Sequence, residues 1–182
     1  MNKAVVFFAE GTEECEACWW WTCSAALKLD VTVASASGSR EILSSHKIRI
    51  TADALAEEVD YSDVDLVVLP GGIPGTPNLA ANKTVTDTCT AFAKSGKKVA
   101  AICAAPSVLA SLGLLEAKMP RPTPDFRTSW PVPCAGRRSG RGRQHHHQLR
   151  SGWCHPFALE LVRQLAGQVE ADRIRNAIAY RH

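Results

Sequence analysis

The chain has 182 residues, of which 46% are hydrophobic and 21% are charged, and its formal net charge is +3. A chain of this length buries about 70% of the surface that its unfolded form exposes, so a core can form without disulfides or a structural metal. The composition excludes disordered and collagen-like chains, and no apolar run approaches the ~20 residues that cross a bilayer.

Short apolar runs alternate with segments of helical periodicity along most of the chain. Near-continuous apolar runs are typical of buried parallel strands, and apolar residues at helical spacing indicate amphipathic helices. The alternation predicts an α/β fold with a mostly parallel sheet covered on both faces, and with function at the carboxyl ends of the strands. In chain order we predict strands at Lys3–Ala9 and Val31–Ser35, a small hairpin including Glu41–Ile50, a strand at Val64–Leu69, a helix at Thr84–Ala93, a strand at Lys98–Ile102, and helices at Pro106–Leu115, Phe157–Leu165 and Glu170–Ala179.

The amino terminus and the cysteines indicate the cellular compartment of the protein. The start Met1–Lys3 leads into a strand-like segment, unlike a signal peptide, so we expect a cytoplasmic protein without a membrane partner. The seven cysteines are an odd number, and we identified no regular ligand spacing among them, which favours free thiols. The adjacent residues His145–His147 cannot easily face one ion together, so we predict no metal site.

Three predicted strands end in unusual sequences. The first runs into the acidic segment Glu10–Glu16, and another ends in the glycine-rich segment Pro70–Gly75, whose backbone N–H groups could approach a ligand closely. A third ends in Cys103–Pro106, which places a thiol between a strand and a helix N-terminus, where thiolate is favoured. These ends predict one site at one edge of the sheet.

The motifs AEGTEECEA, VVLPGGIPG and AAICAAPSVLASLGLL together resemble the ThiJ/PfpI superfamily, and within it the branch of the DJ-type protein deglycases and glyoxalases. The resemblance covers most of residues 1–117 and resumes at Pro156–Leu161. It implies a flavodoxin-like three-layer sandwich of the class I glutamine amidotransferase-like type, formed by residues 1–182 as a single domain. It also implies a homodimer.

The resemblance also implies the site and its chemistry. Cys103 falls on the family nucleophile and Glu16 on the buried glutamate beside it, while Gly72 and Ala104, together with Gly71, form the oxyanion and substrate-binding backbone. The implied reaction converts methylglyoxal, glyoxal or early glycation adducts to hydroxy acids, without a metal or an organic cofactor. Relatives carry an arginine where this chain has His46, which implies weaker anion binding beside the thiol.

Two segments depart from the resemblance. Residues 119–155 are rich in Pro, Arg and His, and residues 18–27 contain the run Trp19–Trp21. Both can be back-translated so that a shifted frame encodes family-like sequence, such as Leu-Val-Val-Asp-Leu-Leu for the first helix. We therefore hypothesise compensated frameshifts, which as translated would damage the first helix and leave residues 119–155 irregular.

Other interpretations of these residues stay open. Cys103 could be a buried core thiol, Glu16 a solvated acid in a first helical turn, and Gly71 with Gly72 a simple turn. The function could instead be that of a redox-sensing or chaperone-like protein with an oxidisable Cys103, or the chain could be an inactive frameshifted product. The arginine–glycine tract Arg137–Arg143 resembles an RNA-binding segment, but the frameshift explains it better, and we expect no nucleic-acid partner.

Overall fold

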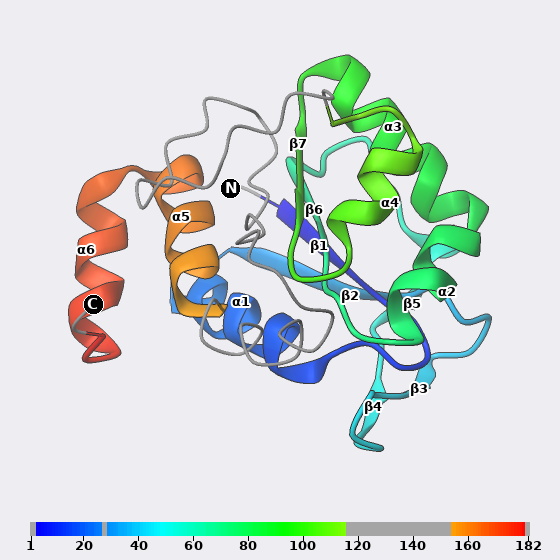
Figure 1. Cartoon of the computed structure of the whole chain (residues 1–182). Helices are drawn as coiled ribbons and strands as arrows, with labels where there is room; N and C mark the ends of the chain where they lie inside the picture. The colour runs from blue at the N-terminus through cyan, green and yellow to red at the C-terminus, as the bar shows by residue number, and fades with distance from the viewer. Residues whose placement is uncertain (1–2, 27–28, 116–153, 181–182) are drawn as a thin grey trace, which may run out of the picture.

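The computed structural model describes residues 3–26, 29–115 and 154–180 (Figure 1). A parallel sheet of five strands runs in the spatial order β5-β2-β1-β6-β7, and β3 pairs with β4 in a separate antiparallel hairpin. The strands are β1 (Lys3–Phe8), β2 (Asp30–Ser35), β3 (Glu41–Leu43), β4 (Arg49–Thr51), β5 (Ala54–Leu55), β6 (Leu66–Leu69) and β7 (Lys98–Ala101). The helices are α1 (Glu14–Ala26), α2 (Gly75–Ala81), α3 (Lys83–Ser95), α4 (Pro106–Ser111), α5 (Cys154–Ala166) and α6 (Gln168–Ala177), with a 3-10 turn η1 at Ala56–Glu58.

The sheet lies between two layers of helices. Figure 1 shows α1, α5 and α6 on one side of it and α2, α3 and α4 on the other. Alternate residues of a strand point to opposite faces, so Val6 of β1 joins the core under α1 and α5, and Phe7 joins the core under α3. Such doubly buried strands explain the continuous apolar runs, and the predicted α/β sandwich with a mostly parallel sheet is confirmed.

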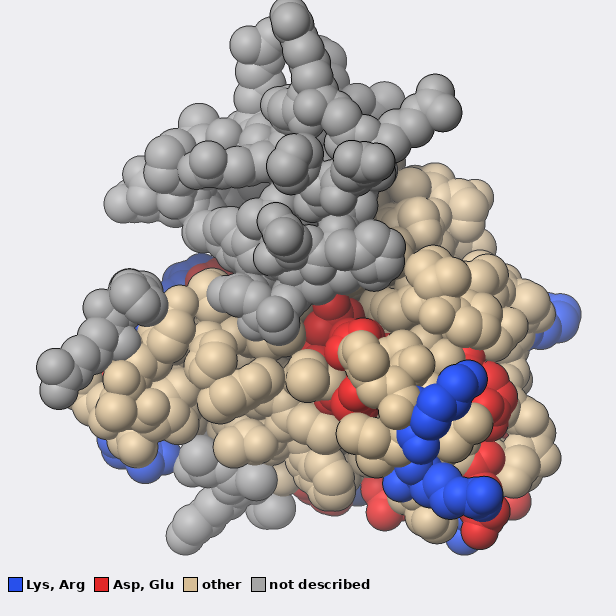
Figure 2. Space-filling model, turned by 60° about the horizontal axis from the view of Figure 1, so that its bottom comes forward, with Lys and Arg blue, Asp and Glu red and all other residues tan. Residues whose placement is uncertain are grey.

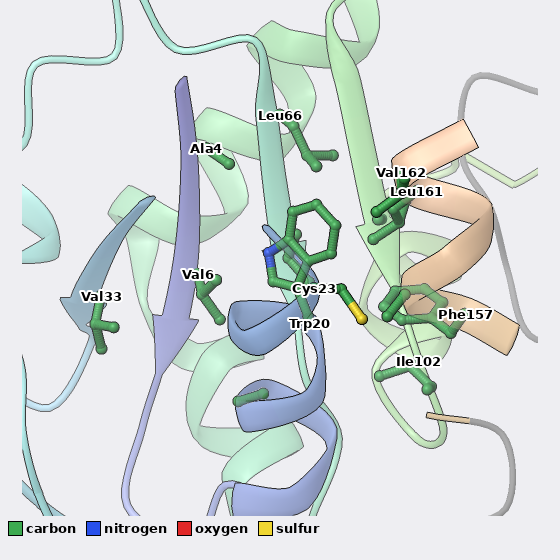
Figure 3. Packing of buried hydrophobic residues seen from close by; sticks show 14 of the residues in the cluster. Ala4, Val6, Trp20, Cys23, Val33, Leu66, Ile102, Phe157, Leu161 and Val162 are labelled. Carbon is green, nitrogen blue, oxygen red and sulfur yellow. The ribbon is translucent and has the colours of Figure 1, made fainter. Parts of the chain in front are cut away.

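The Trp-rich segment forms a helix, contrary to the expectation of a damaged first helix. Along α1, Trp20 and Cys23 lie one turn apart and are fully buried, whereas Trp21 faces outward with 49% of its surface exposed. Figure 3 shows Trp20 and Cys23 among side chains of the sheet and of α5, including Phe157. The sequence of α1 is apolar on almost every side of the helix, and the face that carries Trp20 and Cys23 is the one that packs against the core.

Two aromatic side chains join α1 to the end of the chain through a histidine. The rings of Trp19 and His155 have centroids 3.7 Å apart, and His155 stacks on Tyr180 at 5.0 Å with an interplanar angle of 5°. Burial lowers the pKa of His155, which favours the neutral ring within this stack. The two segments that depart from the family pattern thus contact each other.

Several element boundaries differ from the predictions. The helix predicted to reach Leu115 ends at Ser111, and the first of the final helices begins earlier, at Cys154. The last helix is shifted, since α6 ends at Ala177. The predicted irregular segment 119–155 lies outside the described residues except for Cys154 and His155, which are helical. Among the described residues no helix is long and apolar enough to span a membrane.

Candidate functional site

Cys103 occupies a strained turn directly after β7. The N–H of Ile102 still donates to the carbonyl of Leu69 on β6 at 3.2 Å, and Ala105 N–H then folds back to the carbonyl of Ile102 at 3.0 Å. Between them Cys103 adopts a φ of 61°, a left-handed conformation that is uncommon for a residue with a side chain. Such backbone strain costs about 1–3 kcal/mol and clusters at functional sites. The turn holds the thiol half-buried at the start of α4.

Glu16 reaches the same place from the first turn of α1. Its side chain is 1% exposed, and its Oε2 accepts a hydrogen bond of 2.7 Å from the backbone N–H of Gly71. This bond fixes the carboxyl at the end of β6, beside the turn that carries Cys103. A buried carboxyl is commonly stabilised in its neutral form, which can donate a proton.

Gly71 lies against both Glu16 and Cys103, and a side chain there would force its neighbours to shift. A Cβ at this position would lie 2.8 Å from the Cβ of Cys103, 2.9 Å from Oε2 of Glu16 and 3.0 Å from the backbone nitrogen of Ala104. The thiol residue, the acid and the N–H of Ala104 therefore surround one small space. The structure brings together four of the five residues that the sequence indicates.

Gly72, the fifth residue, belongs to a tight crossing of two loops. It has a φ of 97°, and a Cβ there would lie 2.5 Å from both the nitrogen of Glu13 and the oxygen of Gly11. The N–H of Glu13 donates to the carbonyl of Gly71 at 3.0 Å, and the N–H of Gly75 donates to the carbonyl of Gly11 at 3.1 Å. These two hydrogen bonds hold together the loops at whose crossing Gly72 lies.

An acidic cluster lies at the start of α1, close in sequence to Glu16. His46 Nδ1 lies 2.7 Å from Glu14 Oε1, and the hydroxyl of Ser45 donates to Glu13 Oε2 at 2.8 Å and to Glu14 Oε2 at 3.2 Å. Burial raises the pKa of Glu14, but hydrogen bonds from its own backbone and from Ser44, His46 and Ser45 outweigh burial and lower it. Figure 2 shows a group of acidic side chains near the middle of the view, partly bordered by uncharged atoms.

That cluster is also where a cation could bind within the described part of the chain. Glu13, Glu14 and His46 offer ligand atoms that all lie within 4.8 Å of one another. His46 is 67% exposed, and its ring is already engaged with Glu14. His46 therefore pairs with the first turn of α1.

The sequence analysis missed two features of the cysteines. Cys154 is buried at the start of α5, and its pKa is raised to about 12 by burial first and then by the nearby charges of Glu16 and other groups, Cys103 among them. Long-range packing puts it there, and no local pattern indicates it. The statement that the cysteines lack ligand spacing is wrong, because Cys15-Glu16-Ala17-Cys18 is a CxxC motif, and both of its thiols are exposed.

Comparison with known proteins gives a family model and relatives that agree with one another. The model of the DJ-1/PfpI family matches residues 2–124. Protein DJ-1 homolog A of Arabidopsis thaliana is 33% identical over 99% of this chain and 47% of its own length, and Protein DJ-1alpha of Drosophila melanogaster is 35% identical over 69% of this chain and 58% of its own length. The chain therefore spans less than two thirds of these relatives.

Solved structures agree with the fold. A DJ-1 superfamily protein from Salmonella typhimurium superimposes with a TM-score of 0.83 at 28% identity, with all of both chains covered. The oxidised DJ-1 of Toxoplasma gondii superimposes with a TM-score of 0.81 at 24% identity, again over all of both chains. The flavodoxin-like sandwich of the class I glutamine amidotransferase-like type is thereby confirmed.

Proposed function

Since this chain belongs to the DJ-1/PfpI family, we propose that it is a cofactor-independent glyoxalase or deglycase in which Cys103 is the nucleophile and Glu16 the acid and base. Its substrates are small 2-oxoaldehydes such as methylglyoxal and glyoxal, or early glycation adducts. The observation that carries the proposal is the meeting of Cys103 and Glu16 around Gly71. A thiol and a buried acid in one small space are what addition to an aldehyde requires.

The first step is addition of the thiol to the substrate. The carboxylate of Glu16 accepts the proton of the Cys103 thiol as the sulfur attacks the aldehyde carbon of methylglyoxal. The electron pair of the C=O bond moves to oxygen, and Glu16 returns the proton to that oxygen. The backbone N–H groups of Ala104 and Gly72 are the proposed donors to the developing oxyanion. The nitrogen of Ala104 lies close to the space around Gly71, which supports its role. The product of this step is a hemithioacetal.

The next steps move two protons and add one water. The carboxylate of Glu16 removes the proton from the former aldehyde carbon and delivers it to the ketone oxygen, which gives an enediol. It then takes the proton from the hydroxyl on the former aldehyde carbon and delivers it to the neighbouring carbon. The former aldehyde carbon is thereby oxidised to a thioester and the ketone carbon is reduced to an alcohol. Water then hydrolyses the thioester, which releases lactate and restores the thiol. The reaction is balanced as methylglyoxal plus water giving lactate.

A second candidate is a redox-sensing or chaperone-like function, in which peroxide oxidises Cys103 to a sulfinic acid. The partial exposure of Cys103 favours it, because burial raises the pKa of Cys23 to about 11 and that of Cys89 to about 12 and keeps those thiols protonated. A third candidate is an inactive frameshifted product. Homodimer formation and a cytoplasmic location remain predictions.

The experiment that separates these candidates measures lactate from methylglyoxal with the purified full chain. Many lactate molecules per chain, in the absence of peroxide, support the proposed function. Protection of a client protein from aggregation only after peroxide treatment, without lactate, supports the redox candidate. A broad, poorly cooperative thermal transition without either activity supports the inactive product.

A further inference from the structure

Cys15 and Cys18 form a pair of thiols on the outer side of α1. They are three residues apart in a helix, so they lie on one side of it with Cβ atoms about 5–6 Å apart. Both side chains are exposed. The structure therefore presents two sulfur atoms to solvent within reach of one small ligand.

This pair is separate from the proposed catalytic site, although Glu16 lies between its members in sequence. The side chain of Glu16 is 1% exposed and turns inward to the N–H of Gly71, whereas the two cysteines face solvent. The proposed reaction uses neither thiol. The pair is therefore available for a role of its own.

The surroundings of the pair favour a cation. Glu13 and Glu14 directly precede Cys15 at the start of α1, so two carboxylates lie beside the pair. The same negative charge that opposes a free thiolate attracts a positive ion, which would pair with the two sulfurs once their protons leave.

We propose that Cys15 and Cys18 bind a soft, thiophilic metal ion that is satisfied by two sulfur ligands, with Cu(I) as the biological example. Thiolates select soft ions, and a metal–sulfur bond of about 2.3 Å lets one ion bridge two sulfurs about 4.5 Å apart. Binding replaces two S–H bonds with two metal–sulfur bonds and releases two protons, with no change in oxidation state.

The geometry disfavours the two obvious alternatives. A disulfide needs Cβ atoms about 3.5–4.5 Å apart, closer than the helical spacing, so closing it would distort the first turns of α1. Structural zinc takes four ligands. Among the described residues, the group that offers three closely placed ligand atoms is Glu13, Glu14 and His46, which includes neither thiol.

The test titrates the reduced, metal-free full chain with Cu(I) under anaerobic conditions, in competition with the coloured chelator bathocuproine disulfonate. We expect one Cu(I) per chain to be withheld from the chelator, and the affinity to rise between pH 6 and pH 8 because protons are released. Cys15→Ser and Cys18→Ser should each weaken binding by more than about 100-fold, beyond the 10–100-fold cost of losing an outer-shell partner.

Two controls locate the ion. Cys103→Ser and Cys89→Ala, which remove thiols outside the pair, should keep the affinity of the wild-type chain. In the wild-type chain itself, Cu(I) should protect Cys15 and Cys18 from alkylation by iodoacetamide, which needs no variant to fold. Failure to compete with the chelator, or binding that disappears in Cys103→Ser and persists in both pair variants, would overturn the proposal.

Discussion

Glu16 and Cys103 meet at Gly71, where the Oε2 of Glu16 and the Cβ of Cys103 would lie 2.9 Å and 2.8 Å from a Cβ on residue 71. They come from α1 and from the turn after β7, and the glycine is the first residue of the loop after Pro70 at the end of β6. Three segments distant in sequence thus create one space. That arrangement makes the site sensitive to a single methyl group.

Gly71→Ala should abolish the proposed activity and destabilise the chain. The new Cβ would lie 2.8 Å from the Cβ of Cys103, a distance that forces the turn to move, and such overpacking typically costs about 1–3 kcal/mol. Lactate formation and urea unfolding check both effects. Gly96→Ala is the matched control, because Gly96 has a φ of 74° and open space around it, so the substitution should cost about 1–2 kcal/mol without loss of activity.

Glu16→Gln should separate the proton-transfer role from the structural role. The amide oxygen can still accept the hydrogen bond from Gly71, so the fold should be retained, but the side chain can no longer exchange protons at the site. We expect kcat to fall by about 10²–10⁴-fold, the usual contribution of general acid–base catalysis. A Glu16→Gln protein with wild-type kcat would show that Glu16 only positions the loop.

Glu14 should make the chain less stable in acid. Its pKa is lowered from the usual 4.5, so the unfolded chain binds the proton more tightly than the folded chain does. The contribution of ionised Glu14 to the free energy of unfolding is therefore complete above pH 4.5. It is lost as the pH falls through the lower pKa that Glu14 has in the folded state. Urea unfolding between pH 3 and pH 6 should show this slope, and Glu14→Gln should reduce it. An unchanged slope in the variant would assign the acid sensitivity to other groups.

Trp20 buries an indole N–H that has no hydrogen-bond partner in the described structure. An unsatisfied buried donor costs about 1–3 kcal/mol, so Trp20→Phe removes that penalty while it loses part of the packing. We expect its free energy of unfolding to stay within about 1 kcal/mol of wild type, whereas Trp20→Ala should lose about 3–5 kcal/mol. A loss of well over 1 kcal/mol in Trp20→Phe would contradict the penalty that we assign to the indole N–H.

The layers of the fold could be predicted from the sequence because β1, β6 and β7 are buried on both faces. Their residues therefore form continuous apolar runs in the sequence. The sequence did not predict β5, which has two residues, or α2, which begins at a glycine and carries little periodicity. Short elements of this kind are set by tertiary contacts. Their absence from the sequence prediction does not affect the site.

The site was predictable in part. The strand-end positions of Cys103 and Gly71 follow from the alternation of strands and helices, but the pairing of Glu16 with them depended on the family resemblance, because no local pattern links α1 to β7. The position of Cys154 depends on how α5 packs against α1. The Cys15 and Cys18 pair was visible in the sequence as a CxxC motif, and only the structure shows that both thiols face solvent.

The most direct test of the account is kcat/KM for lactate formation from methylglyoxal by Cys103→Ser, compared with wild type and with Cys89→Ala. Cys89 is buried on the opposite face of the sheet, so its variant controls for the loss of a thiol as such. The account predicts that Cys103→Ser folds, melts near the wild-type temperature and loses at least about 10³-fold in kcat/KM, while Cys89→Ala remains active. Wild-type turnover by Cys103→Ser would contradict the assignment of the nucleophile.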